Sequence, residues 1–163
     1  MNRFDPLRKV MHVDEAVARY AAQPGLVFTD GVFDVLHRGQ VAFLAEARQL
    51  GERLVVAVHA DTARGAPAQP MTREGDRAFL VAALESVDTV VVVHDTSPLA
   101  LIARLRPAVY VQRGDQDMSR LAQTALMHSW GGHAIALPFA DESGTDALAR
   151  RIGGATGAAA GEP

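Results

Sequence analysis

The chain contains no cysteine, and this absence excludes several kinds of chemistry at once. Disulfide bridges, thiolate nucleophiles and cysteine-ligated zinc all require a residue that is missing here. Lysine is nearly absent as well, because Lys9 is the only one and the other fifteen basic residues are arginines. We attribute this bias to genome composition, although arginine also suits bidentate contacts with phosphate groups.

Long apolar runs are absent too. No segment approaches the ~20 apolar residues that a membrane span requires, and residues 1–16 contain no apolar run long enough for a secretory signal. The net charge of −3 argues against a broad basic surface for nucleic acid. We therefore expect a cytoplasmic protein that binds neither membranes nor nucleic acid.

The chain has 163 residues, of which 48% are hydrophobic and 21% charged, as in an ordinary globular protein. This length suits one domain with a substantial core. Residues 1–25 are predicted to form an N-terminal helical extension, with the helix itself at 13–22. The main domain is predicted at 26–152, and the small-residue stretch 153–163 is predicted to be a flexible tail.

Short apolar runs alternate with helical patterns along the chain. The strand-like runs lie at 26–30, 53–59, 89–94, 108–112 and 134–139. The segments with apolar residues at helical spacing lie at 38–51, 72–87, 97–107 and 118–132. Because the strand-like runs are apolar on both faces, they indicate a parallel sheet covered on both sides. The alternation predicts an α/β fold, a Rossmann-like doubly wound sheet of five parallel strands.

The loop after the first strand carries the residues best suited to chemistry. It reads TDGVFDVLHRGQ and ends where a helix begins. Ligands of such sheets bind outside the carboxyl ends of the strands, and the amides at a helix N-terminus attract anions. Gly31 and Gly39 allow a phosphate to approach the backbone, and His37 can donate a hydrogen bond to it. The alternative is that His37 merely caps the helix. Neither a Walker A pattern nor Gly-x-Gly-x-x-Gly occurs.

A longer pattern favours the phosphate interpretation. It comprises VFTDGVFDVLHRGQVAFLAEARQLG, REGDRAFLVAALESVDTVVVV, DTSPLALIARLRPAVYVQRGD, SWGGHAIALPF and SGTDALARRI. In this order the segments resemble the nucleotidyltransferases whose signature is His-x-Gly-His. Among these enzymes the similarity is strongest to the bacterial D-glycero-β-D-manno-heptose 1-phosphate adenylyltransferases. The resemblance extends over residues 27–152.

The resemblance implies roles for particular residues. His37 and Gln40 occupy the two histidine positions of the signature and are the expected catalytic pair. The residues expected to bind the nucleotide and its phosphates are Thr29, Asp30, Gly31, Phe33, Gly39, Pro138, Phe139, Ser143 and Thr145. The residues expected to bind the acceptor substrate are Asp34, Arg77, Arg113 and Asp115.

Some of these positions also have simpler interpretations. Asp115 could be an ordinary turn residue, and Arg77 could be a solvated helix charge. Ser143 or Thr145 could cap a helix, a role compatible with phosphate contact. Trp130 is interpreted as a packing residue, and His59 is assigned no function.

The sequence departs from the family pattern at several phosphate-side positions. Gln40 replaces the second signature histidine; it can donate a hydrogen bond but cannot carry a positive charge. Gln112 and Arg113 stand where the family has lysine and glycine, which moves the positive charge to the opposite face of the strand. His59 replaces an asparagine, and Gly144 replaces a threonine. This distribution fits a paralogue with an altered substrate or with weakened catalysis.

By resemblance, the expected reaction is the transfer of AMP from ATP to a sugar 1-phosphate for lipopolysaccharide core synthesis. Mg²⁺ would accompany ATP, held mainly by the phosphates rather than by protein ligands. One alternative is a cytidylyltransferase acting on glycerol 3-phosphate or another phosphorylated alcohol. A second is a nucleotide-binding protein that has lost turnover. The family resemblance also implies a homodimer.

Overall fold

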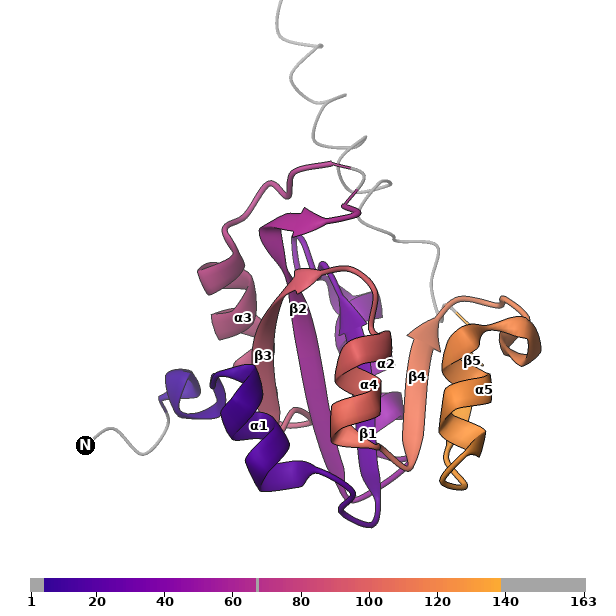
Figure 1. The fold of residues 1–163 in the computed structure, drawn as a ribbon. Coiled ribbons are helices and arrows are strands. Elements are labelled where there is room, and N and C mark those ends of the chain that lie inside the picture. Colours follow the sequence, from indigo (N-terminus) through magenta and orange to yellow (C-terminus); the bar gives the residue numbers. More distant parts are fainter. Residues whose placement is uncertain (1–4, 67, 139–163) are drawn as a thin grey trace, which may run out of the picture.

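Five parallel strands form the centre of the computed structural model, which describes residues 5–66 and 68–138 (Figure 1). The strands are β1 (Leu26–Gly31), β2 (Arg53–Arg64), β3 (Thr89–Asp95), β4 (Val109–Arg113) and β5 (His133–Leu137). Their order across the sheet is β3-β2-β1-β4-β5, and all neighbouring strands pair in parallel. The predicted Rossmann-like doubly wound sheet is therefore confirmed.

Helices cover both faces of this sheet. They are α1 (Val13–Tyr20), α2 (Arg38–Arg48), α3 (Glu74–Ala82), α4 (Leu99–Leu105) and α5 (Ala122–His128), with short 3₁₀ turns η1 (Pro6–Lys9) and η2 (Met118–Arg120). Helices α2 and α3 pack on one face, where Val27 and Val56 belong to a single buried cluster. Helices α1, α4 and α5 pack on the other face, where Phe28 and Val55 belong to a second cluster. Each apolar strand thus supplies side chains to two cores, because successive residues point to opposite faces.

The strand order reverses between β1 and β4. From β1 the chain builds the sheet outward through β2 and β3, then crosses back to place β4 on the other side of β1. Residues Phe28 and Thr29 of β1 are in register with Tyr110 and Val111 of β4. The carboxyl ends of the strands lie at the top in Figure 1. Ligands of such sheets bind at this kind of switch point, and the loop singled out in the sequence follows β1 here.

Some element boundaries differ from the predicted ones. Strand β2 continues beyond His59, because after a register shift it pairs again with β3 at Arg64 and Asp95. The helical segment predicted at 118–132 is divided at Leu121, whose extended backbone separates η2 from α5. The segment before α1 also joins the sheet, since the Met11 amide donates to the Val90 carbonyl at 3.0 Å.

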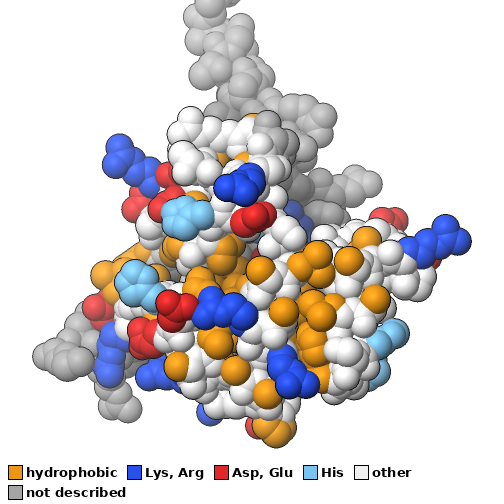
Figure 2. All heavy atoms as spheres, in the orientation of Figure 1, with side chains coloured by type: hydrophobic (Ala, Val, Ile, Leu, Met, Phe, Trp, Pro, Cys, Tyr) orange, Lys and Arg blue, Asp and Glu red, His pale blue; other side chains and the backbone are white. Residues whose placement is uncertain are grey.

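The surface shown in Figure 2 is the face covered by α1 and α4. Basic side chains on this face are dispersed among acidic and apolar ones rather than gathered into a basic patch. None of the helices in the described part of the chain is long and apolar enough to cross a membrane.

Candidate active site

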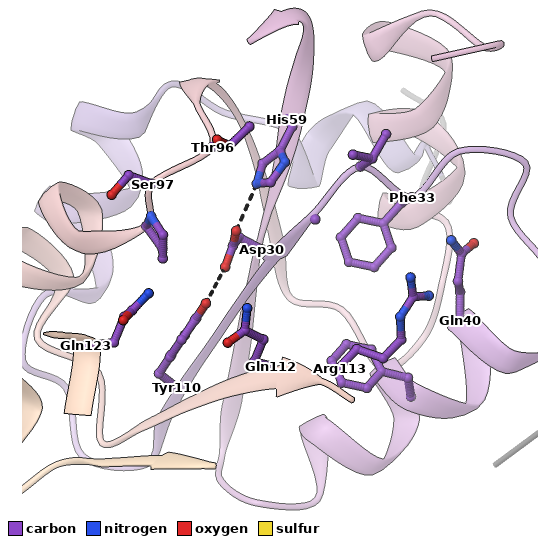
Figure 3. Close-up of a pocket in the computed structure, with 14 residues that line it drawn as sticks. Asp30, Phe33, Gln40, His59, Thr96, Ser97, Tyr110, Gln112, Arg113 and Gln123 are labelled. Atoms are coloured by element: carbon purple, nitrogen blue, oxygen red, sulfur yellow. Dashed lines mark hydrogen bonds and ion pairs between the residues drawn. The ribbon is translucent and has the colours of Figure 1, made fainter. Parts of the chain in front are cut away.

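A cavity of about 490 Å³ lies where β1, β2 and β4 reach their carboxyl ends (Figure 3). We call it the strand-end cavity. Its polar lining residues are Asp30, Gln40, His59, Thr96, Ser97, Tyr110, Gln112, Arg113 and Gln123. These residues come from three strands, from α2 and α5, and from the loop after β3. The cavity therefore occupies the switch point of the sheet, and its size is in the ordinary range for a small-molecule site.

The pleat of β4 divides the strand-end cavity into two halves. Arg113 lies on the side of β4 whose apolar residues pack against α2 and α3, and Figure 3 shows it beside Gln40 and Phe33. Gln112 points to the opposite side, where Tyr110 packs with α4 and α5. We call these the α2-side half and the α4-side half. Neighbouring residues on one strand thus supply different chemistry to the two halves.

Asp30 connects three strands in the α4-side half. Its Oδ2 lies 2.8 Å from Nε2 of His59, and its Oδ1 accepts a hydrogen bond of 2.7 Å from the Tyr110 hydroxyl (Figure 3). Burial and the charge of Asp30 raise the pKa of Tyr110, so the phenol remains protonated and donates. Asp30 was expected to bind phosphate. Its carboxylate instead holds these two side chains, and its negative charge would repel a phosphate.

The loop between β1 and α2 has a strained backbone. Phe33 and Val35 have φ values of +52° and +49°, a region that β-branched and bulky residues rarely occupy. Phe33 is buried and lines the strand-end cavity. A Cβ atom placed on Gly31 would lie 3.1 Å from the Phe33 ring, so a larger residue there would force the ring to shift. Such strain persists only where surrounding contacts hold the backbone in place.

Arg77 supplies part of that support. Arg77 is buried, with its side chain 0% exposed, and it donates to the carbonyl of Val32 in the strained loop. It also donates to the Thr72 carbonyl at 2.9 Å and to Asp61 Oδ1 at 2.7 Å. The guanidinium thus links α3, β2 and the loop. Arg77 is not a solvated helix charge, and its nitrogens face protein oxygens rather than the strand-end cavity.

Asp34 lies within the same loop and joins it to the segment that precedes α3. Its carboxylate accepts hydrogen bonds from the Met71 amide at 2.7 Å, the Thr72 amide at 3.0 Å and the Thr72 hydroxyl at 2.6 Å. Burial raises the pKa of Asp34, but the bonds from Thr72 and Met71 and the charge of Arg77 outweigh this effect, and the pKa lies below its usual value. The ionised carboxylate therefore fixes the segment that precedes α3.

His37 is the N-cap residue of α2, and its two ring nitrogens serve different purposes. Nδ1 accepts a hydrogen bond of 3.1 Å from the Gly39 amide, so the proton of the neutral ring lies on Nε2. Nε2 is buried and has no hydrogen-bond partner among the described residues. Burial and the charge of Arg113 lower the pKa of His37, which favours the neutral ring. The capping interpretation and the phosphate interpretation are thus compatible.

Gln40 and Arg113 complete the α2-side half. Gln40 is 2% exposed and lines the cavity, and its Oε1 atom is buried without a hydrogen-bond partner among the described residues. Arg113 reaches the same half from β4, and burial lowers its pKa, although a guanidinium remains charged. This half therefore combines a positive charge with an amide, close to an imidazole donor. Such groups suit a phosphate.

Other predicted residues lie elsewhere. Thr29 is fully buried, and its hydroxyl donates to the Val111 carbonyl at 2.7 Å, so its side chain joins β1 to β4 and does not line the cavity. Gly39 is buried at the start of α2, where an added Cβ would lie 3.1 Å from the His37 ring. Phe139, Ser143 and Thr145 lie outside the described residues.

A second hollow, of about 650 Å³, lies beside the carboxyl ends of β4 and β5. We call it the β4–α5 hollow. It is lined by residues 114–119, 134–136, Thr124, His128 and Pro138. Asp115 and Pro138 are both exposed and belong to this hollow rather than to the strand-end cavity. The predicted ligand residues are thus divided between two neighbouring hollows on either side of the end of β4.

Sequence reasoning missed several polar residues of the strand-end cavity. His59 was assigned no function, and Tyr110, Thr96, Ser97 and Gln123 were not considered. His59, Thr96 and Ser97 follow apolar strand runs, which was an available signal. There was no such signal for Tyr110, because a tyrosine within an apolar strand does not show which residue its hydroxyl bonds to or which face its side chain occupies.

Comparison with known proteins adds a family to this geometry. Residues 28–135 match the cytidylyltransferase-like family. The chain is 47% identical over 153 residues to the D-beta-D-heptose 1-phosphate adenylyltransferase of Bordetella bronchiseptica, covering 88% of this chain and 93% of that protein. It is 35% identical over 152 residues to the bifunctional protein HldE of Magnetococcus marinus; the match covers 91% of this chain but only 31% of HldE.

A solved structure shows the same architecture. The lipopolysaccharide core biosynthesis protein from Thermoplasma volcanium GSS1 superposes with a TM-score of 0.61 at 26% sequence identity. The match covers 74% of this chain and all (100%) of that chain.

Proposed function

The chain belongs to the cytidylyltransferase-like family of nucleotidyltransferases, and from this premise we propose that it transfers AMP from ATP to D-glycero-β-D-manno-heptose 1-phosphate. The products would be an ADP-sugar and pyrophosphate, and the ADP-sugar would serve lipopolysaccharide core synthesis. The observation that carries this proposal is the 47% identity across 93% of the Bordetella bronchiseptica adenylyltransferase. A cytoplasmic location and a homodimer are further parts of the proposal.

The proposed chemistry needs no covalent enzyme intermediate. An oxygen of the acceptor phosphate attacks the α-phosphorus of ATP, forming a new P–O bond. The bond from the α-phosphorus to the bridging oxygen of the β-phosphate breaks, and its electron pair leaves with pyrophosphate. The protein then has to position the reactants and stabilise the charge that develops on the phosphate oxygens.

The α2-side half offers groups for this task. Arg113 brings a positive charge to this half, and His37, which does not itself line the cavity, lies close enough to be affected by that charge; its buried Nε2–H has no partner among the described residues. Gln40 adds an amide where the family has a second histidine. Because Arg113 and Gln40 come from different elements, a phosphate between them would be contacted from two directions. This arrangement supports placing the reacting phosphates here.

The metal is proposed to enter with the nucleotide. Within residues 5–66 and 68–138, no group of three or more His, Asp or Glu side chains could hold a metal ion. Asp34, an acidic residue expected at the acceptor, already accepts bonds from Met71 and Thr72. Mg²⁺ would therefore be bound mainly by the triphosphate oxygens, as part of the MgATP substrate.

The β4–α5 hollow is proposed to hold the nucleoside. Met118 and Ile135 give it apolar surface for a base, and Asp115 offers a carboxylate for ribose hydroxyls. Pro138, which the resemblance assigns to the wall around the base, lines the same hollow. The strand-end cavity would then receive the acceptor, with the reacting phosphates in its α2-side half.

Pyrophosphate release tests this proposal. The purified protein is incubated with Mg²⁺, heptose 1-phosphate and either ATP or CTP, and the sugar product is identified by mass spectrometry. We expect pyrophosphate and ADP-heptose with ATP, and much slower release with CTP. Release with CTP alone would favour the cytidylyltransferase alternative. Nucleotide binding by calorimetry without release would favour the non-catalytic alternative.

A further inference from the structure

We propose that the α4-side half of the strand-end cavity recognises the hydroxyl groups of a polyhydroxylated acceptor, and that His59 selects this acceptor through its Nδ1 atom. The inference rests on the proposed function, because it assigns a residue to acceptor recognition in that reaction. It adds a specificity-determining side chain at a position that sequence reasoning left without a role.

The ring of His59 is held in a defined orientation. An ionised carboxylate can only accept hydrogen bonds, so Nε2 of His59 donates to Asp30 across 2.8 Å. Asp30 is itself fixed by the Tyr110 hydroxyl at 2.7 Å, and Tyr110 is fully buried. His59 lines the cavity (Figure 3), and because Nε2 is bonded to Asp30, Nδ1 is the ring nitrogen that remains for a ligand among the described residues. A hydroxyl group suits Nδ1, because it can both donate and accept a hydrogen bond.

The charges of the cavity favour one orientation of a sugar phosphate. Asp30 places a negative charge in the α4-side half, whereas Arg113 places a positive charge in the α2-side half. A phosphate bound beside Asp30 would be repelled by it, and the same phosphate beside Arg113 would be attracted. The uncharged, hydroxyl-bearing part of the acceptor is therefore left for the α4-side half.

An independent observation is that one buried acceptor atom in this half has no donor in the described part of the chain. Oε1 of Gln112 is buried and has no partner among the described residues. Figure 3 shows this side chain beside Asp30 and Tyr110. A buried carbonyl oxygen without a donor is unfavourable unless a ligand or water supplies one. A sugar hydroxyl can donate to Gln112 while another contacts His59.

Two isosteric substitutions separate ligand contact from ring anchoring. His59→Gln retains an amide near the position of Nε2, where it can still bond to Asp30, but it removes Nδ1. His59→Asn retains a polar group near the position of Nδ1 but loses the bond to Asp30. We expect His59→Gln to weaken heptose 1-phosphate binding about fivefold to tenfold, the effect of one lost hydrogen bond. His59→Asn should weaken it less, and ATP affinity should change in neither variant.

The measurements are calorimetric dissociation constants for heptose 1-phosphate and for ATP, together with KM and kcat. A contact with the acceptor raises its KM while kcat and the ATP constants stay near wild type. His133→Gln is the matched control, because His133 is exposed at the amino end of β5, away from the cavity. It should leave every constant unchanged.

The wild-type protein gives a reading that does not depend on a variant folding. The ¹⁵N resonance of His59 Nδ1 should shift on addition of heptose 1-phosphate and not on addition of inorganic phosphate. The inference is wrong, and the proposed function stands, if the enzyme is active but His59→Gln leaves the acceptor affinity unchanged. The same holds if the enzyme is active and this resonance does not move. If the acceptor binds in a way that depends on His59 but no pyrophosphate is released, the inference stands and the proposed function is wrong.

Discussion

Replacing Arg77 with methionine tests whether this residue supports the active-site loop or contacts substrate. Methionine approximates the length of the arginine stem, so the substitution removes the guanidinium while leaving little empty volume. It abolishes the bonds to the Val32 carbonyl, the Thr72 carbonyl and Asp61 Oδ1. The two carbonyls would lose their donor, and Asp61 would lose its counterion.

The expected loss of stability follows from these contacts. Removing one partner of a buried ion pair costs about 3–5 kcal/mol. The side chain of Asp61 is 25% exposed and can be partly rehydrated, so the lower end of this range applies. We therefore expect the free energy of unfolding to fall by about 3 kcal/mol. At about 2–4 °C per kcal/mol for a chain of this length, Tm should fall by about 6–12 °C.

Urea denaturation and scanning calorimetry measure this change, and Arg73→Met is the matched control. Arg73 is exposed at the N-cap of α3 and makes no side-chain capping bond, so its replacement should change the free energy of unfolding by less than about 0.5 kcal/mol. KM and kcat are measured at a temperature where every variant is folded. If the Arg77→Met protein has wild-type stability but a strongly raised KM for the acceptor, Arg77 does not support the loop, and the prediction that it contacts the substrate is correct.

Three further substitutions test the phosphate side of the site. Gln40→His should raise kcat for pyrophosphate release at least tenfold, equivalent to about 1.4 kcal/mol of transition-state stabilisation; an unchanged kcat would mean that Gln40 is not a transition-state contact. Arg113→Gln should raise the pKa of His37, measured by NMR titration, because it removes a positive charge that opposes protonation. The pKa of His37 is lower in the folded protein than the value of about 6.5 expected in the unfolded chain. The free energy of unfolding should therefore fall as the pH drops below about 6.5. This fall should be smaller in the Arg113→Gln variant. Thr29→Val should cost about 1 kcal/mol in urea denaturation through the lost bond to Val111 and leave the KM for ATP unchanged, whereas a raised KM would reinstate Thr29 as a phosphate contact.

The sheet could be predicted from the sequence because its signal is local. Each strand is a short apolar run, and a strand buried on both faces needs little else to be recognised. The loop after β1 was also recognisable, since it combines glycines and a histidine directly before a helix. Its backbone was not, because nothing in the residue types of Phe33 or Val35 predicts the positive φ values that they adopt.

The partners of polar side chains could not be predicted in the same way. Asp30 bonds to His59 and to Tyr110, which are 29 and 80 residues away in sequence. Arg77 reaches Val32 across 45 residues. Such contacts depend on the strand order and on the direction in which each side chain points. The sequence alone does not single out one of several possible partners. The resemblance therefore identified Arg77 and Asp30 as important positions, whereas their roles required the packed structure.

The change from lysine and glycine to Gln112 and Arg113 can be understood from the pleat of β4. In sequence it moves a positive charge by one position, but on a strand that step carries the charge from one face of the sheet to the other. The guanidinium now lies beside Gln40, where the α2-side half lacks the second signature histidine, and a neutral amide takes its place beside Asp30 (Figure 3). The negative charge of Asp30 then faces amides and hydroxyls rather than a phosphate. If the proposed function holds, the residues at 40, 112 and 113 would act together: they would keep a positive charge near the reacting phosphates and leave the α4-side half suited to an uncharged polyol.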